Sequence, residues 1–181
     1  MVSPADGQVS DITELAHDSL IGGPAVRVGI FLSVFNVHVN RSPCDGRVLA
    51  IQYRKGKFFN AMRHGHASEQ NESNTIVLAE PDGQRPIAVV KQIVGLIARR
   101  IVCTVAPDDR LQRGQRIGMI KFGSRTELTI AKWLDPQIAV RIGQPVHGAA
   151  DIIAVLGNPI QAQDADPGRT LQSLLPRETS A

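Results

Sequence analysis

Short apolar runs rich in Val and Ile recur along the whole chain, and Gly, Pro and Asp separate them. Runs of this length and spacing predict an all-β or strongly β-dominated domain. The predicted strands are 25–32, 34–39, 47–53, 75–79, 87–97, 101–105, 117–122, 127–130, 138–142 and 152–156. Helical patterns are scarce, and the best candidates are short segments at 11–16 and 59–63.

Two sequence patterns occur twice. Ser3-Pro4-Ala5-Asp6-Gly7 returns as Ser42-Pro43-Cys44-Asp45-Gly46, and 110–115 resembles 140–146. Each Pro-x-Asp-Gly turn precedes a predicted strand. The paired hairpins are similar to the barrel-sandwich, or hammerhead, arrangement of lipoyl and biotinyl domains, so we expect one mainly β domain over 1–157 with a few short helices. From 158 to 181 the apolar pattern gives way to Pro, Gln, Asp and Ser, which predicts a mobile tail.

Composition narrows the classes of protein. The 181 residues suffice for a core, and the two cysteines have no CxxC spacing, which disfavours a disulfide framework or structural zinc. A net charge of +3 and 4% aromatic residues give little support for nucleic-acid binding. No apolar run approaches the roughly 18 residues of a membrane span, so we expect a soluble chain. Basic clusters at 54–57, 99–100 and 110–116 could meet an anionic membrane surface, although a solvated basic face is the favoured explanation for each cluster alone.

A serine that follows glycine can cleave its own backbone, and Gly123-Ser124 directly follows a predicted strand. If the Ser124 hydroxyl lies over the Gly123 carbonyl, an N-to-O acyl shift converts the amide to an ester. β-Elimination of that ester leaves dehydroalanine, which hydrolyses to a pyruvoyl group and ammonia. Glycine leaves the carbonyl open to attack because it has no Cβ. A Gly-Ser pair alone is far more often a turn or linker, so the neighbouring sequence decides.

Six blocks in order resemble phosphatidylserine decarboxylase, in the short form of archaea and many bacteria. They are Ser3-Pro4-Ala5-Asp6-Gly7, Phe35-Asn36-Val37-His38-Val39-Asn40-Arg41-Ser42-Pro43, Gly56-Lys57-Phe58, Ala67-Ser68-Glu69-Gln70-Asn71-Glu72-Ser73-Asn74, Gln92-Ile93-Val94-Gly95 and Gly118-Met119-Ile120-Lys121-Phe122-Gly123-Ser124-Arg125. Each block alone is weak, but their order and spacing are specific. The resemblance also suggests that a segment precedes residue 1, because family members usually begin with hydrophobic sequence.

The resemblance implies an autocatalytically cleaved zymogen. Its β chain would be 1–123 and its α chain would start at Ser124, with both chains held together as a heterodimer. A pyruvoyl group formed from Ser124 would be the prosthetic group, with neither a metal nor pyridoxal phosphate. The amino group of phosphatidylserine would form a Schiff base with it, lose carbon dioxide and leave as phosphatidylethanolamine. Such a carboxy-lyase of phospholipid biosynthesis would work peripherally on the cytoplasmic membrane of a bacterium, on its cytoplasmic side.

Two residues are candidates for proton transfer and its support. His38 comes first, because an imidazole with a pKa near 6.5 can accept the Ser124 proton or deliver one after decarboxylation. The alternative is a structural histidine. Asp6 matches the aspartate that the family uses in self-cleavage, where it would orient a base. Taken alone it is a turn aspartate, as Asp45 is expected to be.

Three further residues are candidates for substrate binding. Longer bacterial relatives carry two histidines three residues apart, whereas this chain has His38 followed by Arg41. One histidine could then serve both steps, or Arg41 could bind the substrate carboxylate or phosphate. Asn71 and Asn74 could donate hydrogen bonds to the scissile carbonyl or the head group, or they could be turn residues.

Other classes of function stay open at this point. A phosphocarrier module would need two facing histidines, one of them in a His-Ile-Gly context that this chain lacks. A non-catalytic, hammerhead-like lipid-binding module is disfavoured because Asp6, His38 and Ser124 are all present. His64 and His66 have the spacing of a metal pair, but an exposed loop is favoured and no metal is expected. The expected partners are phosphatidylserine at an anionic membrane surface and no nucleic acid, with further homo-oligomerisation left open.

Overall fold

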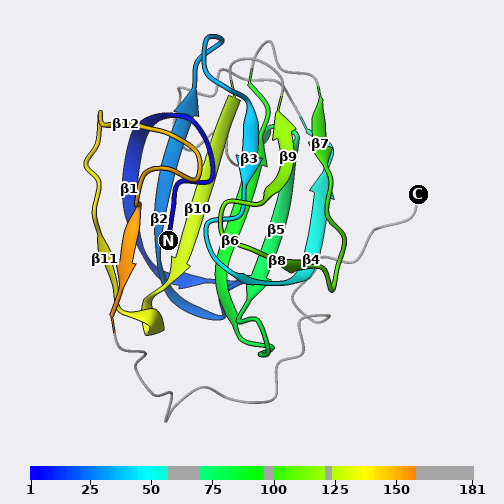
Figure 1. The fold of residues 1–181 in the computed structure, drawn as a ribbon, viewed down its shortest axis with the longest axis vertical. Helices are drawn as coiled ribbons and strands as arrows, with labels where there is room; N and C mark the ends of the chain where they lie inside the picture. The colour runs from blue at the N-terminus through cyan, green and yellow to red at the C-terminus, as the bar shows by residue number, and fades with distance from the viewer. Residues whose placement is uncertain (57–69, 96–99, 121–123, 158–181) are drawn as a thin grey trace.

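The computed structural model describes residues 1–56, 70–95, 100–120 and 124–157, and strands dominate it (Figure 1). The strands are β1 (Gly7–Asp18), β2 (Gly23–Leu32), β3 (Val39–Arg41), β4 (Gly46–Arg54), β5 (Ser73–Ala79), β6 (Pro86–Ile93), β7 (Ile101–Cys103), β8 (Arg110–Leu111), β9 (Arg116–Ile120), β10 (Ser124–Ala131), β11 (Pro136–Ile138), β12 (Pro145–Val146) and β13 (Ala154–Leu156). One short 3-10 helix, η1 (Lys132–Leu134), follows β10. The expected mainly β fold is confirmed.

Strand β10 lies inside the main sheet. This antiparallel sheet has eight strands in the order β12-β1-β2-β10-β6-β5-β4-β8, and a three-stranded sheet has the order β3-β9-β7. Strand β10 pairs with β2 from Ser124 opposite Leu32 to Ala131 opposite Ala25, and with β6 on its other edge. The chain after Ser124 therefore supplies a central strand to a sheet built mainly from the chain before it.

The two faces of the main sheet differ in chemistry. Successive side chains of a strand point to opposite faces. On one face, called the core face here, apolar side chains are fully buried; they include Val28, Ile30, Val90, Leu128 and Ile130. The opposite face, called the polar face, carries Arg27, Lys91, Arg125, Glu127 and Thr129. Because side chains alternate along β10, Ser124 and Thr126 lie on the core face and Arg125 lies on the polar face.

The repeated turns form a two-fold arrangement inside the chain. The Val2 N–H donates to the Pro43 carbonyl at 2.8 Å, and the Arg41 N–H donates to the Pro4 carbonyl at 2.9 Å. In each turn the first serine hydroxyl donates a hydrogen bond to the backbone carbonyl two residues later, at 2.7 Å for Ser3 and at 2.8 Å for Ser42. Strands β1 and β4 start from these turns and pair with the short strands β12 and β8. The duplication seen in the sequence is therefore a duplication in space.

One predicted helix and two predicted strands need correction, and two further predictions fall outside the described residues. The predicted helix at 11–16 is wrong, because these residues belong to β1 and pair with β2. The predicted strand at 34–39 is a loop up to residue 38, and the strand at 138–142 ends at Ile138. In the first case, pairing with an apolar neighbouring strand outweighs a weak helical periodicity. The predicted helix at 59–63 and the tail at 158–181 lie outside the described residues.

Candidate active site

Ser124 begins β10 at one end of the main sheet. Its side chain is fully buried, and its Oγ makes no hydrogen bond within the described part of the chain. A buried polar atom without a partner is costly, and natural proteins tend to keep one only where function requires it. Gly123 lies outside the described residues.

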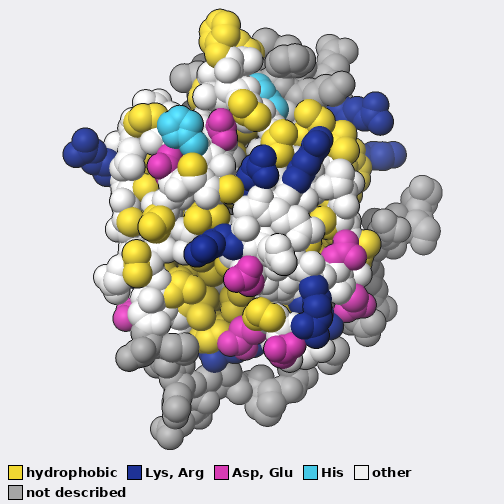
Figure 2. All heavy atoms as spheres, in the orientation of Figure 1, with side chains coloured by type: hydrophobic (Ala, Val, Ile, Leu, Met, Phe, Trp, Pro, Cys, Tyr) yellow, Lys and Arg dark blue, Asp and Glu magenta, His cyan; other side chains and the backbone are white. Residues whose placement is uncertain are grey.

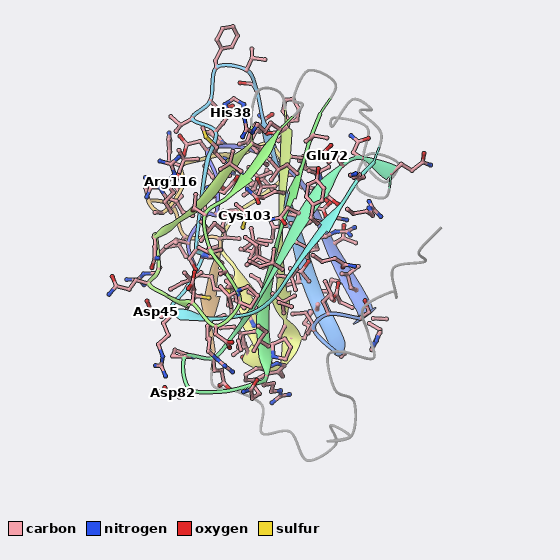
Figure 3. The ribbon with its side chains drawn as sticks, turned by 90° about the vertical axis from the view of Figure 1, so that its right-hand side faces the viewer. His38, Asp45, Glu72, Asp82, Cys103 and Arg116 are labelled. Atoms are coloured by element: carbon pink, nitrogen blue, oxygen red, sulfur yellow. The ribbon has the colours of Figure 1, made fainter. Side chains whose placement is uncertain are left out.

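His38 lies at the same end of the molecule as Ser124. Its carbonyl accepts a hydrogen bond of 3.1 Å from the N–H of Ile120, the last residue of β9. Four chain steps separate Ile120 from Ser124, and they span at most about 14 Å. Figure 3 shows His38 at the end of the molecule opposite Asp45 and Asp82. Two residues far apart in sequence are thus brought to one end of the fold.

The environment of His38 favours its neutral form. The ring is half-buried, and its Nε2 atom is buried. Burial lowers the pKa of His38 from its usual value of 6.5, and a hydrogen bond with the Asn36 backbone partly offsets this effect. An imidazole with a lowered pKa is uncharged at neutral pH and can accept a proton there.

A chain of buried side-chain hydrogen bonds lies next to Ser124 on the core face. The Asn40 amide donates to the Thr126 hydroxyl at 2.9 Å, and the Gln92 amide donates to Asn40 Oδ1 at 2.9 Å. The Asn74 amide donates to Gln92 Oε1, also at 2.9 Å. These bonds join β3, β10, β6 and β5 two residues after Ser124. A satisfied buried network of this kind rigidifies the strands it connects.

Arg125 anchors the polar face directly after Ser124. Its side chain is 2% exposed and lies 2.7 Å from Asp11 and 3.0 Å from Glu127, and it donates to the Ser10 hydroxyl at 2.6 Å. Burial alone would lower the pKa of Arg125, but the bonds to the two carboxylates raise it overall. A Cβ at Gly29 would collide with both the guanidinium and Asp11, so this position must be glycine for the contact to form.

Asp6 reaches the same end of the sheet but is engaged in a turn. Gln8 and Arg125 both pair with Phe31, so their backbones are two strand spacings, about 10 Å, apart. Asp6 precedes Gln8, and its Oδ1 accepts a hydrogen bond of 2.8 Å from the Gly148 N–H. Asp45 accepts one of 2.8 Å from the Arg113 N–H in the equivalent turn. The shared turn role accounts for both aspartates, and only Asp6 lies at the Ser124 end.

The three predicted substrate-binding residues all have contacts within the protein. Arg41 donates to the Gly114 carbonyl at 2.9 Å, and Asn71 donates to the Val94 carbonyl at 2.8 Å. Asn74 is a strand residue within the buried amide chain rather than a turn residue. Each of the three residues therefore has a structural contact, and its role in substrate binding stays a prediction.

The sequence reasoning missed three residues of this site. Asn40 and Gln92 appeared only as parts of family blocks, and Arg125 only as the neighbour of Ser124. Gln92 could have been identified from the sequence, because a lone amide side chain in the apolar run 87–97 needs a buried hydrogen-bond partner. No local signal identifies the distant partners of Arg125, which are set by strand pairing.

Neither the cavity nor the possible metal ligands of the described residues add a residue to this site. A cavity of about 270 Å³ lies on the polar face, lined in part by Arg27, Lys91 and Glu127, and Ser124 and His38 do not line it. Within the described ranges, no group of three or more His, Cys, Asp and Glu side chains is arranged to hold a metal ion. His64 and His66 lie outside those ranges. Among the described residues, no helix combines the length and apolar character needed to cross a membrane.

Comparison with known proteins gives a consistent result. Residues 1–154 match the family model described as phosphatidylserine decarboxylase. The chain is 48% identical over 153 residues to the phosphatidylserine decarboxylase proenzyme of Carboxydothermus hydrogenoformans, covering 84% of this chain and 70% of that protein. Proenzymes of the same name from Syntrophus aciditrophicus and Rhodopirellula baltica are 47% and 46% identical, over 81% and 85% of this chain. The chain spans 66% and 63% of the length of these two relatives.

Proposed function

The chain belongs to the phosphatidylserine decarboxylase family, and from this premise we propose that it cleaves itself before Ser124 and decarboxylates phosphatidylserine to phosphatidylethanolamine. The observation that carries the proposal is the buried Ser124 Oγ, which makes no hydrogen bond within the described part of the chain, at the end of the sheet that also holds His38. Curated relatives carry the name proenzyme, which supports a cleaved precursor.

Self-cleavage needs a base for the Ser124 hydroxyl. As Oγ attacks the Gly123 carbonyl carbon, the C–N bond breaks and the acyl group passes from nitrogen to oxygen. A second proton transfer, from the Ser124 Cα, then eliminates the ester as the Gly123 carboxylate and leaves dehydroalanine. Water hydrolyses the dehydroalanine to the pyruvoyl group and releases its nitrogen as ammonia. Neutral His38 is the candidate to accept a proton in these steps, because burial lowers its pKa. Asp6 is the candidate to orient or charge-stabilise that base.

The resulting pyruvoyl group fits the residues around Ser124. The serine side chain is small and its Oγ is unbonded within the described residues, so no contact there must break when the hydroxyl is lost. The group supplies a ketone that can condense with the substrate amine and accept the electrons released with carbon dioxide. His38 would return a proton to the former α-carbon, and Arg41 is the candidate to bind substrate phosphate or carboxylate.

The two products of cleavage would remain one folded unit. The α chain starting at Ser124 supplies β10, which lies between β2 and β6, and β12, which pairs with β1. The β chain, 1–123, supplies the remaining strands of the main sheet. We therefore propose a heterodimer of the two chains, acting peripherally at the cytoplasmic membrane, where its lipid substrate resides.

Intact-mass analysis of the purified chain tests this proposal. We expect two fragments that part after Gly123, the smaller lacking a free amino terminus and about 17 Da lighter than a chain that starts with serine. Ser124→Ala should abolish both cleavage and decarboxylation. An uncut chain that still decarboxylates phosphatidylserine would contradict the mechanism.

Ser73→Ala provides the matched control. Ser73 is also a buried serine, 2% exposed, at the start of β5, which is separated from β10 by β6 in the same sheet. It has no glycine before it and should leave cleavage intact. If both serine variants fail to cleave, loss of a buried hydroxyl damages the fold and the assignment of Ser124 loses its support.

A further inference from the structure

Three apolar side chains project from the loop between β2 and β3. Val34 is 42% exposed, Phe35 is 94% exposed and Val37 is 58% exposed. We call these three residues the apolar tip. The β2–β3 loop extends beyond the strands at the upper end of the molecule, and a hydrophobic cap marks that end (Figures 1 and 2). Single exposed apolar residues are ordinary, but three on one projecting loop indicate a surface that contacts something.

The loop is built to hold these side chains outward. The Asn36 Oδ1 accepts hydrogen bonds of 2.8 Å from both the N–H and the hydroxyl of Ser33. The Asn36 N–H donates in turn to the Ser33 carbonyl at 3.1 Å. These polar groups bond within the turn, which reduces the cost of moving the loop out of water. The apolar tip is therefore fixed in shape and partly prepared for an apolar medium.

Position links the apolar tip to the candidate active site. The loop starts after Leu32, which pairs with Ser124, and ends at His38. A surface that the apolar tip enters would therefore lie next to Ser124 and His38.

Charge at this end of the molecule fits an anionic surface. Strand β4 ends at Arg54, in the same row of paired residues as Arg125, and Lys55 follows it; both are exposed. Figure 3 shows Glu72 toward the His38 end and Asp45 and Asp82 at the opposite end. Basic residues near an anionic bilayer each add about 1 kcal/mol of attraction. Arg54 and Lys55 can therefore add to the attraction between the Ser124 end and such a surface.

We propose that the apolar tip inserts into the surface of an anionic phospholipid bilayer and holds the Ser124 end of the sheet at the lipid head groups. The proposal rests on the proposed function for its choice of a lipid surface. Three apolar side chains form an anchor too small for permanent insertion, so the contact is reversible and depends on the basic residues beside it.

Vesicle co-sedimentation of the 181-residue chain at low salt tests the proposal. The chain should bind vesicles of phosphatidylcholine mixed with phosphatidylglycerol. Phe35→Asp should weaken partitioning at least tenfold, equivalent to about 1.4 kcal/mol. Val37→Asp should weaken it as well. Val155→Asp is the matched control, because Val155 is 55% exposed on β13 against 58% for Val37, and it should bind like the parent.

Several outcomes would overturn the proposal. They are absence of vesicle binding by the parent, equal binding by Phe35→Asp and the parent, and equal losses for Val37→Asp and Val155→Asp. If the parent is a dimer and Phe35→Asp is a monomer with unchanged vesicle binding, the apolar tip binds a second copy instead. Activity of the parent on a dispersed short-chain phosphatidylserine is measured separately. That activity tests the proposed function independently of vesicle binding.

Discussion

Replacement of Arg125 by methionine should destabilise the fold strongly. Methionine retains much of the side-chain volume but removes the charge and its hydrogen bonds. The guanidinium makes contacts of 2.7 Å to Asp11 and 3.0 Å to Glu127. The Glu127 side chain is 3% exposed and the Asp11 side chain is 20% exposed, so Glu127 would suffer most from the loss of its partner.

The expected magnitude follows from these contacts. Two opposite unit charges whose centres are about 4 Å apart attract each other by about 4 kcal/mol at an effective dielectric constant near 20, and this applies to each of the two carboxylates. The cost of burying the three charges cancels much of this gain. Removing only the cation breaks a buried ion pair, which typically costs about 3–5 kcal/mol. Lys91 lies opposite Glu127 on β6, and its charge offsets part of that cost. We therefore expect a loss of about 3 kcal/mol, the lower end of this range, in the free energy of unfolding.

Urea unfolding in the uncut Ser124→Ala background measures this loss on a single chain. The double replacement Arg125→Met and Glu127→Leu should recover at least half of it, because a buried ion pair can be exchanged for apolar side chains at little cost. Two results would refute the reasoning: a loss below about 1 kcal/mol for Arg125→Met, or no recovery in the double variant. Either would mean that the cluster is not held in a low-dielectric environment.

Three further predictions concern the surrounding residues. The cleavage rate should rise with pH and level off with a midpoint below 6.5, because burial lowers the pKa of His38 and only the neutral ring accepts a proton; a midpoint above 6.5 in a pH series would exclude this role. Asp6→Asn and Asp45→Asn should each cost about 1 kcal/mol of stability in urea titrations, but only Asp6→Asn should slow cleavage, by about tenfold or more. Equal cleavage rates for the two variants would mean that Asp6 serves only the turn. Gln92→Leu should cost about 2–4 kcal/mol in the same titrations, because it removes the donor to Asn40 Oδ1 and the acceptor of the Asn74 amide N–H; a smaller loss would mean that water replaces the amide.

Local sequence predicted those parts of the fold that depend on neighbouring residues. The two Pro-x-Asp-Gly turns were visible because proline, aspartate and glycine each restrict the backbone of the turn. Most strands were found because apolar runs bounded by turn residues need no distant partner to be recognised. The same reasoning failed at 11–16, where Ile12 and Leu15 have a helical spacing and the pairing of β1 with β2 decides the conformation.

The candidate site was only partly predictable for the same reason. Ser124 and His38 could be proposed from the sequence because the proposed cleavage and proton transfer require particular side chains. Their common location depends on the pairing of β10 with β2 and on the bond between Ile120 and His38. Nothing near Arg125 in the sequence points to Asp11, which lies 114 residues away. Contacts of this separation arise from topology rather than from a local pattern.

Strand β10 is held by polar contacts on both faces immediately after the proposed cut. Arg125 binds Asp11 and Glu127 on the polar face, and Thr126 accepts a hydrogen bond from Asn40 on the core face. A newly formed chain end normally frays, because its first residues lose the covalent tether that ordered them. Here, strand pairing on both edges and buried partners on both faces replace that tether from the first residue after Ser124. The fold can therefore lose the bond before Ser124 and still keep this position fixed, as chemistry on a group at a chain end requires.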